Sequence, residues 1–361
     1  MKHVEEYRRK DLVTKLARQI DAKLDRPVTL MEVCGTHTMA IHRHGLPDLL
    51  PPELKLLSGP GCPVCVTPTG FIDAAIELSQ KENVTLATFG DLVRVPGSTT
   101  SLEGRKAEGA DVVTVYSPLD ALAAAEKRPD RNLIFLAVGF ETTAPTGALV
   151  VQEARNRGLQ NFAVLVGNKL VPPALRALLQ DEAVKIDGFI CPGHVSTIIG
   201  AKAYEPIVRE FGVPCVVAGF EPVDILAAIL WLVEMVVSDE PEVRNAYERV
   251  VTWEGNHAAM DCMNEVFEVE DSLWRGLGVI PASGLRLNDT YREFDAAARF
   301  DVVMHEVPDT SGCRCGDVLR GAIEPTECPL FAVRCTPESP VGPCMVSSEG
   351  TCAAFYKYRR E

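Results

Sequence analysis

Residues 133–156 read LIFLAVGFETTAPTGALVVQEARN: a short apolar run, a polar loop and a longer amphipathic segment. The run Leu133–Val138 has the length and composition of a strand. Apolar residues then recur with helical spacing in Ala148–Asn156. A strand, a loop and a helix in this order form the unit from which parallel α/β sheets are built. This stretch therefore predicts an α/β fold.

The same alternation of apolar runs and amphipathic segments extends from about residue 28 to residue 240. The amphipathic segments suit helices, among them Gly70–Lys81 and Leu119–Lys127. We therefore predict parallel α/β layers. The further strand candidates are Val28–Cys34, Lys55–Leu57, Val84–Phe89, Val112–Tyr116, Phe162–Val166, Gly188–Cys191 and Pro214–Ala218.

A weak internal repeat indicates two similar lobes. The segment LLSGPGCPVC, a helix and VTLATFGDLV resembles GFICPGHVST, a helix and VPCVVAGFEPVDIL. Gly59 and Phe89 are 30 positions apart, and Pro192 and Phe220 are 28 positions apart. We expect two α/β lobes that face one another, with both Pro-Gly turns near a shared cleft.

The last third of the chain is less regular. After Asp239 the periodic pattern weakens; Glu242–Val250 is expected to form a helix, and residues 253–312 irregular structure with short strands. The last 50 residues are rich in proline and glycine and contain six of the twelve cysteines. A loop-rich unit of this size buries little apolar surface, so it needs a staple.

The size, charge and apolar content of the chain limit its function. With 361 residues, of which 47% are hydrophobic, we expect two or three domains with real cores. The net charge of −14, from 36 basic and 50 acidic residues, disfavours a nucleic-acid partner. The charged N-terminus does not resemble a signal peptide, and the apolar run Ile225–Val237 is too short to span a membrane. We therefore expect a cytoplasmic protein.

Twelve cysteines in a cytoplasmic chain point to metal binding, catalysis or redox exchange, because reducing compartments disfavour disulfides. The C-terminal group contains no pair of CxxC knuckles, so a zinc ribbon fits poorly. Four thiols for a [4Fe-4S] cluster and two for a neighbouring dithiol is an economical division. Structural zinc and buried free thiols are the alternatives. The six C-terminal cysteines are Cys313, Cys315, Cys328, Cys335, Cys344 and Cys352.

The segment Cys62-Pro-Val-Cys65 follows a Gly-Pro-Gly turn and precedes a helix expected to begin near Thr69. A helix N-terminus stabilises a thiolate and makes the cysteine reactive. Proline inside CxxC is typical of dithiols that cycle between thiol and disulfide, and no second CxxC is present to complete a zinc site. We interpret Cys62 and Cys65 as a redox pair, with a structural role as the alternative.

The segment MEVCGTHTMAIHRHG places Cys34 at the end of an apolar strand, with His37 three residues later. Parallel α/β sheets bind their ligands at the carboxyl ends of the strands. Cys34 and His37 are therefore expected to face one metal or substrate. His42 and His44 lie on the following helix and are expected to be solvated.

Three further polar residues follow predicted strands and are candidates for a cleft between the lobes. Glu141 in AVGFETTAPTG lies at a helix start, where capping is the simpler role. His194 lies in CPGHVSTIIG, and Glu221 lies in AGFEPVDIL. No GxxxxGK or GxGxxG phosphate loop is present, so a nucleotide-hydrolysing enzyme is the weakest hypothesis, and weak ATP turnover stays open only as a secondary activity.

Five motifs occur in order over nearly the whole chain: MEVCGTHTMAIHRHGL, GPGCPVCVTP, GFETTAPT, CPGHVSTIIG and PVGPCMVSSEGTCAA. Together they resemble the HypD family, which acts in maturation of the metal centre of [NiFe]-hydrogenases. The resemblance implies two similar α/β lobes, at residues 28–142 and 143–240. It also implies a third domain, built from residues 1–27 with 241–361, that carries an iron–sulfur cluster.

The resemblance also implies partners and site residues. In the HypD family the protein works with a small chaperone, HypC, and with the cyanide-delivering HypE, and together they assemble an Fe(CN)2CO iron. The family's metal-site cysteine falls on Cys34, and its exchangeable dithiol falls on Cys62 and Cys65. A [4Fe-4S] cluster falls on the tail, with Cys313, Cys328, Cys335 and Cys352 as ligands and Cys315 with Cys344 as the neighbouring pair.

These assignments lead to two hypotheses. In the first, electrons pass from the cluster through a dithiol to Cys62 and Cys65, and then to an iron held by Cys34, while His37 orients the iron or transfers a proton. In the second, the protein is a stand-alone thiol oxidoreductase that reduces a protein disulfide. Such an enzyme would share the cluster and the dithiol, but it would have no use for Cys34 or His37.

Overall fold

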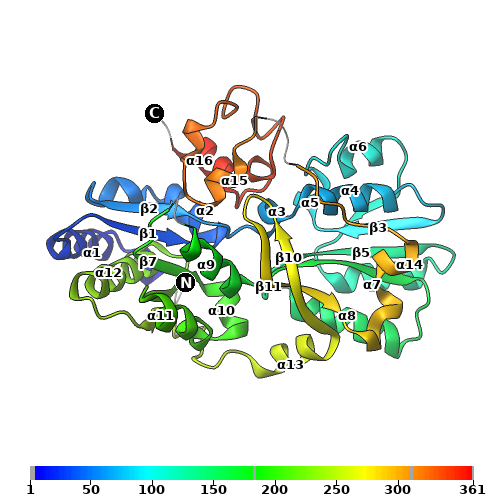
Figure 1. Ribbon diagram of the computed structural model, residues 1–361, viewed down its shortest axis with the longest axis horizontal. Helices are drawn as coiled ribbons and strands as arrows, with labels where there is room; N and C mark the ends of the chain where they lie inside the picture. The colour runs from blue at the N-terminus through cyan, green and yellow to red at the C-terminus, as the bar shows by residue number, and fades with distance from the viewer. Residues whose placement is uncertain (1–4, 182–183, 309–311, 360–361) are drawn as a thin grey trace.

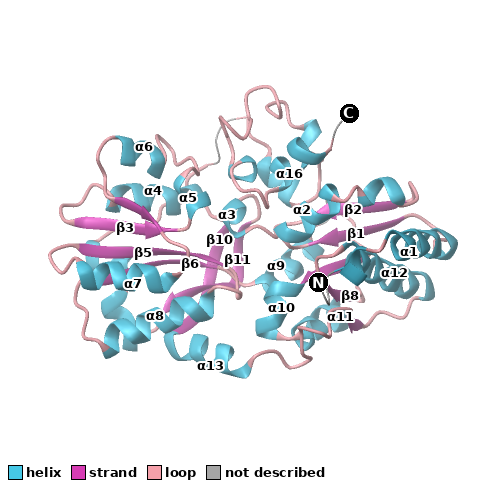
Figure 2. Cartoon of the chain, turned by 180° about the vertical axis from the view of Figure 1, so that it is seen from behind, coloured by secondary structure: helices cyan, strands magenta, loops and turns pink. Residues whose placement is uncertain are grey.

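Two parallel sheets and the helices that cover them form two lobes, which lie side by side along the long axis of the molecule (Figure 1). The computed structural model describes residues 5–181, 184–308 and 312–359. An antiparallel hairpin lies between the lobes, and the cysteine-rich C-terminal segment lies against the same junction (Figure 2). The expected α/β fold class, with two parallel-sheet lobes and a loop-rich cysteine segment, is confirmed.

The first lobe is built on sheet A, five parallel strands in the order β2-β1-β7-β8-β9. β7 and β8 are buried along their whole length, which explains their uninterrupted apolar sequence. The strands are β1 (Val28–Glu32), β2 (Leu54–Ser58), β7 (Gly188–Pro192), β8 (Cys215–Ala218) and β9 (Val243–Asn245). The helices of this lobe are η1 (Glu5–Arg8), α1 (Lys10–Lys23), α2 (Gly35–Arg43), η2 (Leu46–Leu49), α9 (Val171–Gln180), α10 (Gly193–Ile199), η3 (Ala201–Tyr204), α11 (Glu205–Phe211) and α12 (Pro222–Ser238).

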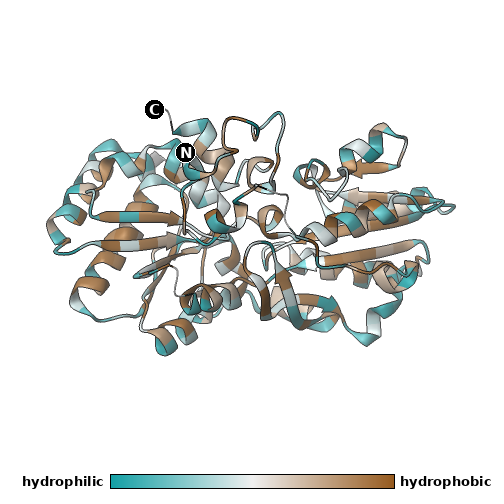
Figure 3. Cartoon of the chain, turned by 45° about the horizontal axis from the view of Figure 1, so that its top comes forward, coloured by the Kyte–Doolittle hydropathy of each residue, from teal (hydrophilic) through white to brown (hydrophobic). Residues whose placement is uncertain are grey.

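The second lobe is built on sheet B, four parallel strands in the order β4-β3-β5-β6. Apolar residues concentrate in the strands of both sheets (Figure 3). The strands are β3 (Val84–Thr88), β4 (Val112–Thr114), β5 (Asn132–Gly139) and β6 (Phe162–Asn168). The helices around this sheet are α4 (Thr69–Leu78), α5 (Gly90–Val93), α6 (Leu102–Ala107), α7 (Pro118–Lys127), α8 (Ala144–Asn156), α13 (His257–Val266), η4 (Asp289–Phe294) and α14 (Ala296–Phe300).

The two sheets share one strand order. If the strands of each sheet are numbered along the chain, sheet A runs 2-1-3-4-5 and sheet B runs 2-1-3-4. In both, the chain leaves the first strand in one direction and later continues from the third strand in the other. Each sheet therefore has one point where the connections diverge, between β1 and β7 in sheet A and between β3 and β5 in sheet B. The prediction of two similar lobes is confirmed.

The lobes are not continuous segments of the chain. β1 and β2 belong to the same sheet as β7, so the division expected at residue 142 differs from the strand pairing. The expected repeat also pairs the wrong segments, because the stretch from Gly59 to Phe89 passes from sheet A to sheet B. Both Pro-Gly turns consequently lie on sheet A. Strand pairing is decided by long-range contacts that a local pattern does not record.

The segments assigned to a third domain are distributed over the molecule. α1 packs on α12 in the first lobe, through the buried side chains of Ala17 and Ile20, and does not join the C-terminal cysteines. The helix expected at Glu242–Val250 is wrong, since β9 forms there as an edge strand of sheet A. Residues 253–312 are more regular than expected: they contain α13, the hairpin, η4 and α14.

The hairpin joins β10 (Phe267–Trp274) to β11 (Gly278–Leu287) and bridges the lobes. Leu170, at the start of α9, donates its N–H to the Ser283 carbonyl at 2.9 Å. Arg275 donates its N–H to the Val66 carbonyl at 2.9 Å. The hairpin therefore fixes the two crossings of the chain between the lobes. None of the helices in the described part of the chain is long and apolar enough to cross a membrane.

The C-terminal segment consists of short helices joined by turns. It rests on α2 and on α3 (Pro63–Val66), the short helix that contains the second half of CxxC. Its core consists largely of cysteine side chains rather than aliphatic ones. The short helices are α15 (Cys315–Leu319), η5 (Pro325–Glu327), η6 (Pro343–Met345) and α16 (Thr351–Tyr358).

Candidate functional site

Three predicted motifs meet at the carboxyl edge of sheet A. Cys34 follows β1, His194 follows β7, and Phe220 follows β8. The connections diverge between β1 and β7, and parallel sheets open a ligand site at such a point because the adjacent loops turn away from each other. The structure therefore places Cys34 where the fold most readily accepts a ligand.

Cys34 is a buried thiol, with 7% of its surface exposed. Burial raises the pKa of this thiol to about 12, although the N–H groups of His37 and Thr36 at the start of α2 oppose the rise. The thiol is therefore neutral when no cation is near. A metal ion reverses this preference, because a coordinating thiol is deprotonated.

His37 is fully buried and holds an unused nitrogen. Its Nε2 lies 2.9 Å from the Gly219 carbonyl oxygen, which only accepts, so Nε2 carries the proton. Nδ1 therefore holds a lone pair, and it has no hydrogen-bond partner among the described residues. Burial lowers the pKa of His37 to about 4, which keeps the ring neutral. A neutral imidazole with a free lone pair can accept a proton or bind a metal.

An aromatic stack connects His37 to the surface. The ring centroid of Phe220 lies 4.8 Å from that of His37 and 4.0 Å from that of His194. His194 is exposed at the outer end of this stack. Of the other two histidines, His44 is exposed as expected, but the expectation is wrong for His42, which is half-buried against Phe355 with the rings 4.3 Å apart.

A buried carboxyl supports the Cys34 loop. Glu32 accepts a hydrogen bond from the Cys34 N–H at 2.9 Å, and its other oxygen accepts one from the Thr38 hydroxyl. Burial raises the pKa of Glu32 to about 7. On the opposite side of the loop, the Thr36 hydroxyl donates to Glu349 at 2.6 Å. Glu349 lies between Cys344 and Cys352, so this bond ties the cysteine segment to the start of α2.

The Gly-Pro-Gly turn brings CxxC against Cys34. Gly35 donates its N–H to the Gly61 carbonyl at 2.9 Å. A Cβ at Gly61 would lie 2.1 Å from the Cys34 nitrogen, so only glycine permits this approach of the two backbones. Cys62 directly follows Gly61, and the CxxC motif therefore begins beside the Cys34 loop.

Cys62 and Cys65 form the N-terminal turn of α3. Cys62 is the N-cap residue, and its sulfur accepts a hydrogen bond from the Cys65 N–H at 3.3 Å. Burial raises the pKa of the Cys65 thiol well above its ordinary value, while the neighbouring Cys344 thiol opposes the rise. Cys65 thus lies between its CxxC partner and the C-terminal cysteines. The helix expected from Thr69 is confirmed as α4, although the motif itself also forms a helix.

All six C-terminal cysteines line one small cavity. Within it, the sulfurs of Cys315 and Cys344 are 2.8 Å apart. Cys344 also contacts the Cys65 thiol through the packing of η6 on α3. The sequence-predicted pair of Cys315 and Cys344 is therefore adjacent, and it lies next to CxxC.

The remaining four cysteines of the cavity offer a thiol donor set that suits an iron–sulfur cluster. Cys335 accepts a hydrogen bond from the Val341 N–H at 3.3 Å, the kind of N–H···S contact that tunes cluster sulfurs. A Cβ at Gly342 would lie 2.6 Å from the Cys313 sulfur, so glycine lets the backbone approach this ligand candidate. Among the described residues, no group of three or more His, Cys, Asp or Glu side chains is arranged to hold a single metal ion. The donor set fits a cluster better than mononuclear zinc.

The two carboxylate candidates for a cleft have structural partners. Glu221 forms an ion pair with Arg8 of η1, with a second contact at 2.7 Å, and its N–H bonds to Asp224 in a capping box at the start of α12. Glu141 is buried after β5 and accepts a hydrogen bond from the Val171 N–H at 2.9 Å, which fixes the start of α9. Neither residue lies on the Cys34 loop.

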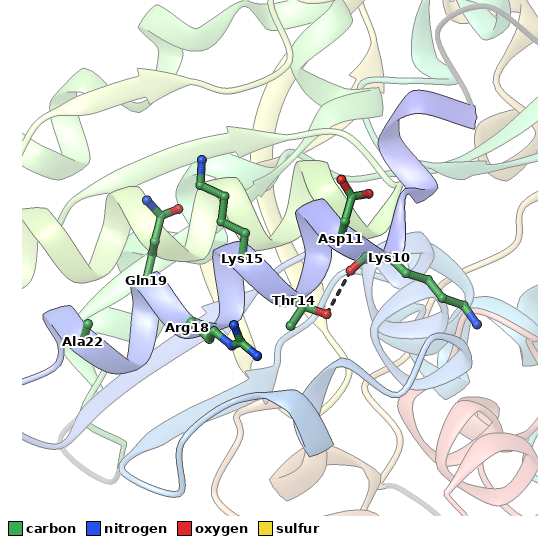
Figure 4. A pocket seen from close by; sticks show the side chains of 7 residues that line it. All are labelled: Lys10, Asp11, Thr14, Lys15, Arg18, Gln19 and Ala22. Atoms are coloured by element: carbon green, nitrogen blue, oxygen red, sulfur yellow. Dashed lines mark hydrogen bonds between the residues drawn. The ribbon is translucent and has the colours of Figure 1, made fainter.

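A shallow hollow of about 570 Å³ runs along α1 and is remote in character from the thiol site (Figure 4). Its side chains come from successive turns of one exposed helix face, and it contains no cysteine or histidine. Its residues are Lys10, Asp11, Thr14, Lys15, Arg18, Gln19 and Ala22. The chemistry of the molecule therefore lies elsewhere, at the junction of α2, α3 and the cysteine segment.

Comparison with known proteins identifies the family. The model of the HypD family, described as the Hydrogenase formation hypA family, matches residues 10–359. The chain belongs to the HypD family. The family match includes Cys34, both cysteines of CxxC and all six C-terminal cysteines. Every thiol of the candidate site therefore lies within the part of the chain that matches HypD.

Similar proteins match the chain from end to end. The hydrogenase maturation factor HypD of Cupriavidus necator is 47% identical over 370 residues, which cover 100% of this chain and 98% of the relative. The protein of the same name from Rhizobium leguminosarum bv. viciae is 49% identical and covers 100% and 96%. The HypD of Escherichia coli K12 is 46% identical and covers 100% and 99%.

Sequence reasoning missed three residues around the HypD thiol site. Glu32 has a visible signal, because it is the one carboxylate in the otherwise apolar run VTLME. Phe220 and Glu349 carry no such signal, since an aromatic in a loop and an exposed-looking glutamate are common. Only the packing of β8 and of the C-terminal segment brings them to Cys34 and His37.

Proposed function

We propose that this chain is a cytoplasmic hydrogenase maturation factor that holds an Fe(CN)2CO iron at Cys34 during its assembly. The observation that supports this most is the run of neighbouring thiols from the Cys34 loop through Cys62 and Cys65 to Cys344 and Cys315. The relatives from Cupriavidus necator and Escherichia coli carry the name hydrogenase maturation factor. As partners we propose a small HypC-type chaperone and a HypE-type cyanide-delivering protein.

In this proposal Cys34 binds the iron as a thiolate. The thiol is buried and neutral on its own, so the arriving cation displaces its proton. His37 is the nearest neutral base on the same turn of α2, with a lone pair on Nδ1. We assign it the acceptance of a proton or the orientation of the iron's ligands. Soft thiolate ligands suit iron that carries cyanide and carbon monoxide.

The C-terminal thiols reduce CxxC by exchange. The Cys344 thiolate attacks the Cys65 sulfur of an oxidised Cys62–Cys65 pair, and the Cys315 thiolate then displaces Cys65 from the mixed disulfide. One disulfide is reduced and one is formed, so two electrons move to CxxC. The contact of Cys344 with both Cys65 and Cys315 supports this order. A [4Fe-4S] cluster on Cys313, Cys328, Cys335 and Cys352 would supply electrons to the Cys315–Cys344 pair.

The test is iron analysis of the anaerobically purified protein with its chaperone. We expect iron in excess of the cluster's four atoms, with infrared bands of bound cyanide and carbon monoxide. Cys34→Ala is expected to lose this extra iron and the bands while keeping the cluster iron and sulfide. Cys262→Ala is the matched control, because Cys262 lies on α13, bonded to Pro145 and Gln152, away from the other thiols. Full retention of the extra iron in Cys34→Ala would refute the proposal.

The same experiment separates the second candidate, a stand-alone thiol oxidoreductase. That function needs only the contact between Cys65 and Cys344, which the structure contains. It predicts cluster iron alone, no bands from cyanide or carbon monoxide, and a Cys34→Ala variant with unchanged disulfide reductase activity.

A further inference from the structure

A cavity of about 200 Å³ lies at the carboxyl end of β6, between the second lobe and the hairpin. It is separate from the thiols, although one wall is the turn Thr67–Pro68 that follows α3. Two polar residues at the end of β6, Asn168 and Lys169, line its floor, and both are 3% exposed. The carboxyl edge of a parallel sheet is the usual ligand site of such folds.

Lys169 is a buried amine without a counterion. Its Nζ donates to the Ser272 hydroxyl at 2.9 Å and to the Leu273 carbonyl at 2.7 Å, and it lies 5.4 Å from the Trp274 ring centroid. All these partners are neutral. Among the described residues Lys169 forms no ion pair, and the carboxylate on its own wall, Glu270, is 3.9 Å from Arg286 instead.

A buried ammonium with only neutral partners is costly, because its lost hydration is not replaced by an opposite charge. The cost is visible in the titration of the side chain: burial lowers the pKa of Lys169 to about 7. An ammonium has three donors, and the two hydrogen bonds to Ser272 and Leu273 leave one. A small anion in the cavity would supply both the missing charge and an acceptor.

Asn168 adds an independent sign of a ligand. Its Oδ1 is buried and has no hydrogen-bond partner among the described residues. An unsatisfied buried acceptor costs about 1–3 kcal/mol, so native structures seldom keep one without a reason. A ligand that offers a hydroxyl or amino hydrogen would satisfy it.

The other wall of the cavity limits the size and charge of the ligand. Glu270 and Asp271 are exposed at the hairpin side of the opening, and Phe71, Leu285 and Met304 supply apolar surface. Exposed carboxylates repel a polyanion such as a nucleotide. The volume admits only a few non-hydrogen atoms beside the amine.

We propose that this cavity binds a small monocarboxylate that also carries a hydroxyl or amino donor. The carboxylate pairs with the Lys169 ammonium, and the donor bonds to Asn168 Oδ1. The site is distinct from the thiol site and does not depend on the proposed maturation function. Its wall at Thr67, two residues after Cys65, places the ligand next to the CxxC helix.

The test compares three probes of similar size by calorimetry on the full-length protein: glycolate, acetate and glycolamide. Glycolate has both features, acetate lacks the hydroxyl, and glycolamide lacks the charge. We expect glycolate to bind about tenfold more tightly than acetate, the value of one hydrogen bond of about 1.4 kcal/mol, and glycolamide not to bind. Equal binding of all three probes, or of none, would overturn the proposal.

Variants and pH locate the binding. Lys169→Met is expected to abolish glycolate binding, and Lys202→Met, which removes an exposed lysine paired with Glu254, to leave it unchanged. In the wild-type protein the affinity should fall about tenfold per pH unit above pH 7, because the free amine must then take up a proton. Glu270, Asp271 and His305 also face the cavity, and keeping the range at pH 7–9 leaves their charge constant. A pH-independent affinity, or binding to Lys169→Met, would refute the assignment.

Discussion

At the scale of single residues, Glu141 shows how a fold can hold a carboxyl against its preference for water. One oxygen accepts the Val171 N–H, and the other has no hydrogen-bond partner among the described residues. Burial raises the pKa of Glu141 from 4.5 to about 7. The folded state therefore binds this proton more tightly than the unfolded chain, and the residue favours folding only while it is protonated.

This gives a pH prediction with a definite sign. The contribution of Glu141 is complete below pH 4.5 and is lost as the pH rises to about 7, a change of about 3 kcal/mol. Glu141→Gln should remove this part of the slope of unfolding free energy against pH, measured in urea between pH 5 and pH 8. Glu103→Gln, on the exposed surface of α6, is the control. An unchanged slope in Glu141→Gln would show that the carboxyl is ionised in the folded protein.

At the scale of elements, the hairpin β10–β11 is held by one aromatic side chain. Trp274 is 1% exposed, donates its indole N–H to the Ser283 hydroxyl at 2.8 Å, and stacks on Phe140 at 5.8 Å between centroids. Phe140 follows β5 of the second lobe, so this stack connects the hairpin to sheet B. The hairpin position therefore depends on packing rather than on its own turn.

We expect Trp274→Ala to lower the free energy of unfolding by about 3–5 kcal/mol, because it leaves a cavity and an unpaired hydroxyl. Trp253→Ala should change it by less than about 0.5 kcal/mol, since Trp253 is 42% exposed. Urea unfolding followed by circular dichroism measures both. A loss in Trp274→Ala no larger than in Trp253→Ala would mean that the hairpin is fixed by its backbone bonds alone.

At the scale of the whole molecule, stability is divided unequally. The two lobes bury large aliphatic cores on both faces of their sheets. The cysteine segment has only short helices, and thiols form much of its core. A segment of this kind depends on its metal centre or on the surface beneath it.

Removal of iron and sulfide by a chelator should therefore loosen residues 312–359 and leave both lobes folded. Hydrogen exchange followed by mass spectrometry is the measurement: amides of α15 and α16 should exchange faster, and those of β5 and β7 should not change. Equal loss of protection in β5 would show that the segment supports the lobes as well. No change in α15 and α16 would show that the segment needs no metal centre.

The sequence by itself determined the elements and the chemical inventory. All eight predicted strands lie within two residues of observed ones, because an apolar run bounded by turn residues is a local signal. α8 begins four residues earlier than predicted, at Ala144, because Pro145 suits the first turn of a helix. The Cys34 loop was also placed correctly at a strand end, since the carboxyl ends of parallel strands are where ligand residues gather.

Only the tertiary structure decided which elements meet. A buried parallel strand such as β1 carries nothing in its sequence that distinguishes β7 from β5 as a neighbour, because both offer an apolar run of matching period. The same holds for the site. His37 gains its free lone pair from a carbonyl at Gly219, and Cys65 gains its neighbour from Cys344, each more than a hundred residues away. Such pairings arise from packing over long separations, and local sequence does not encode them.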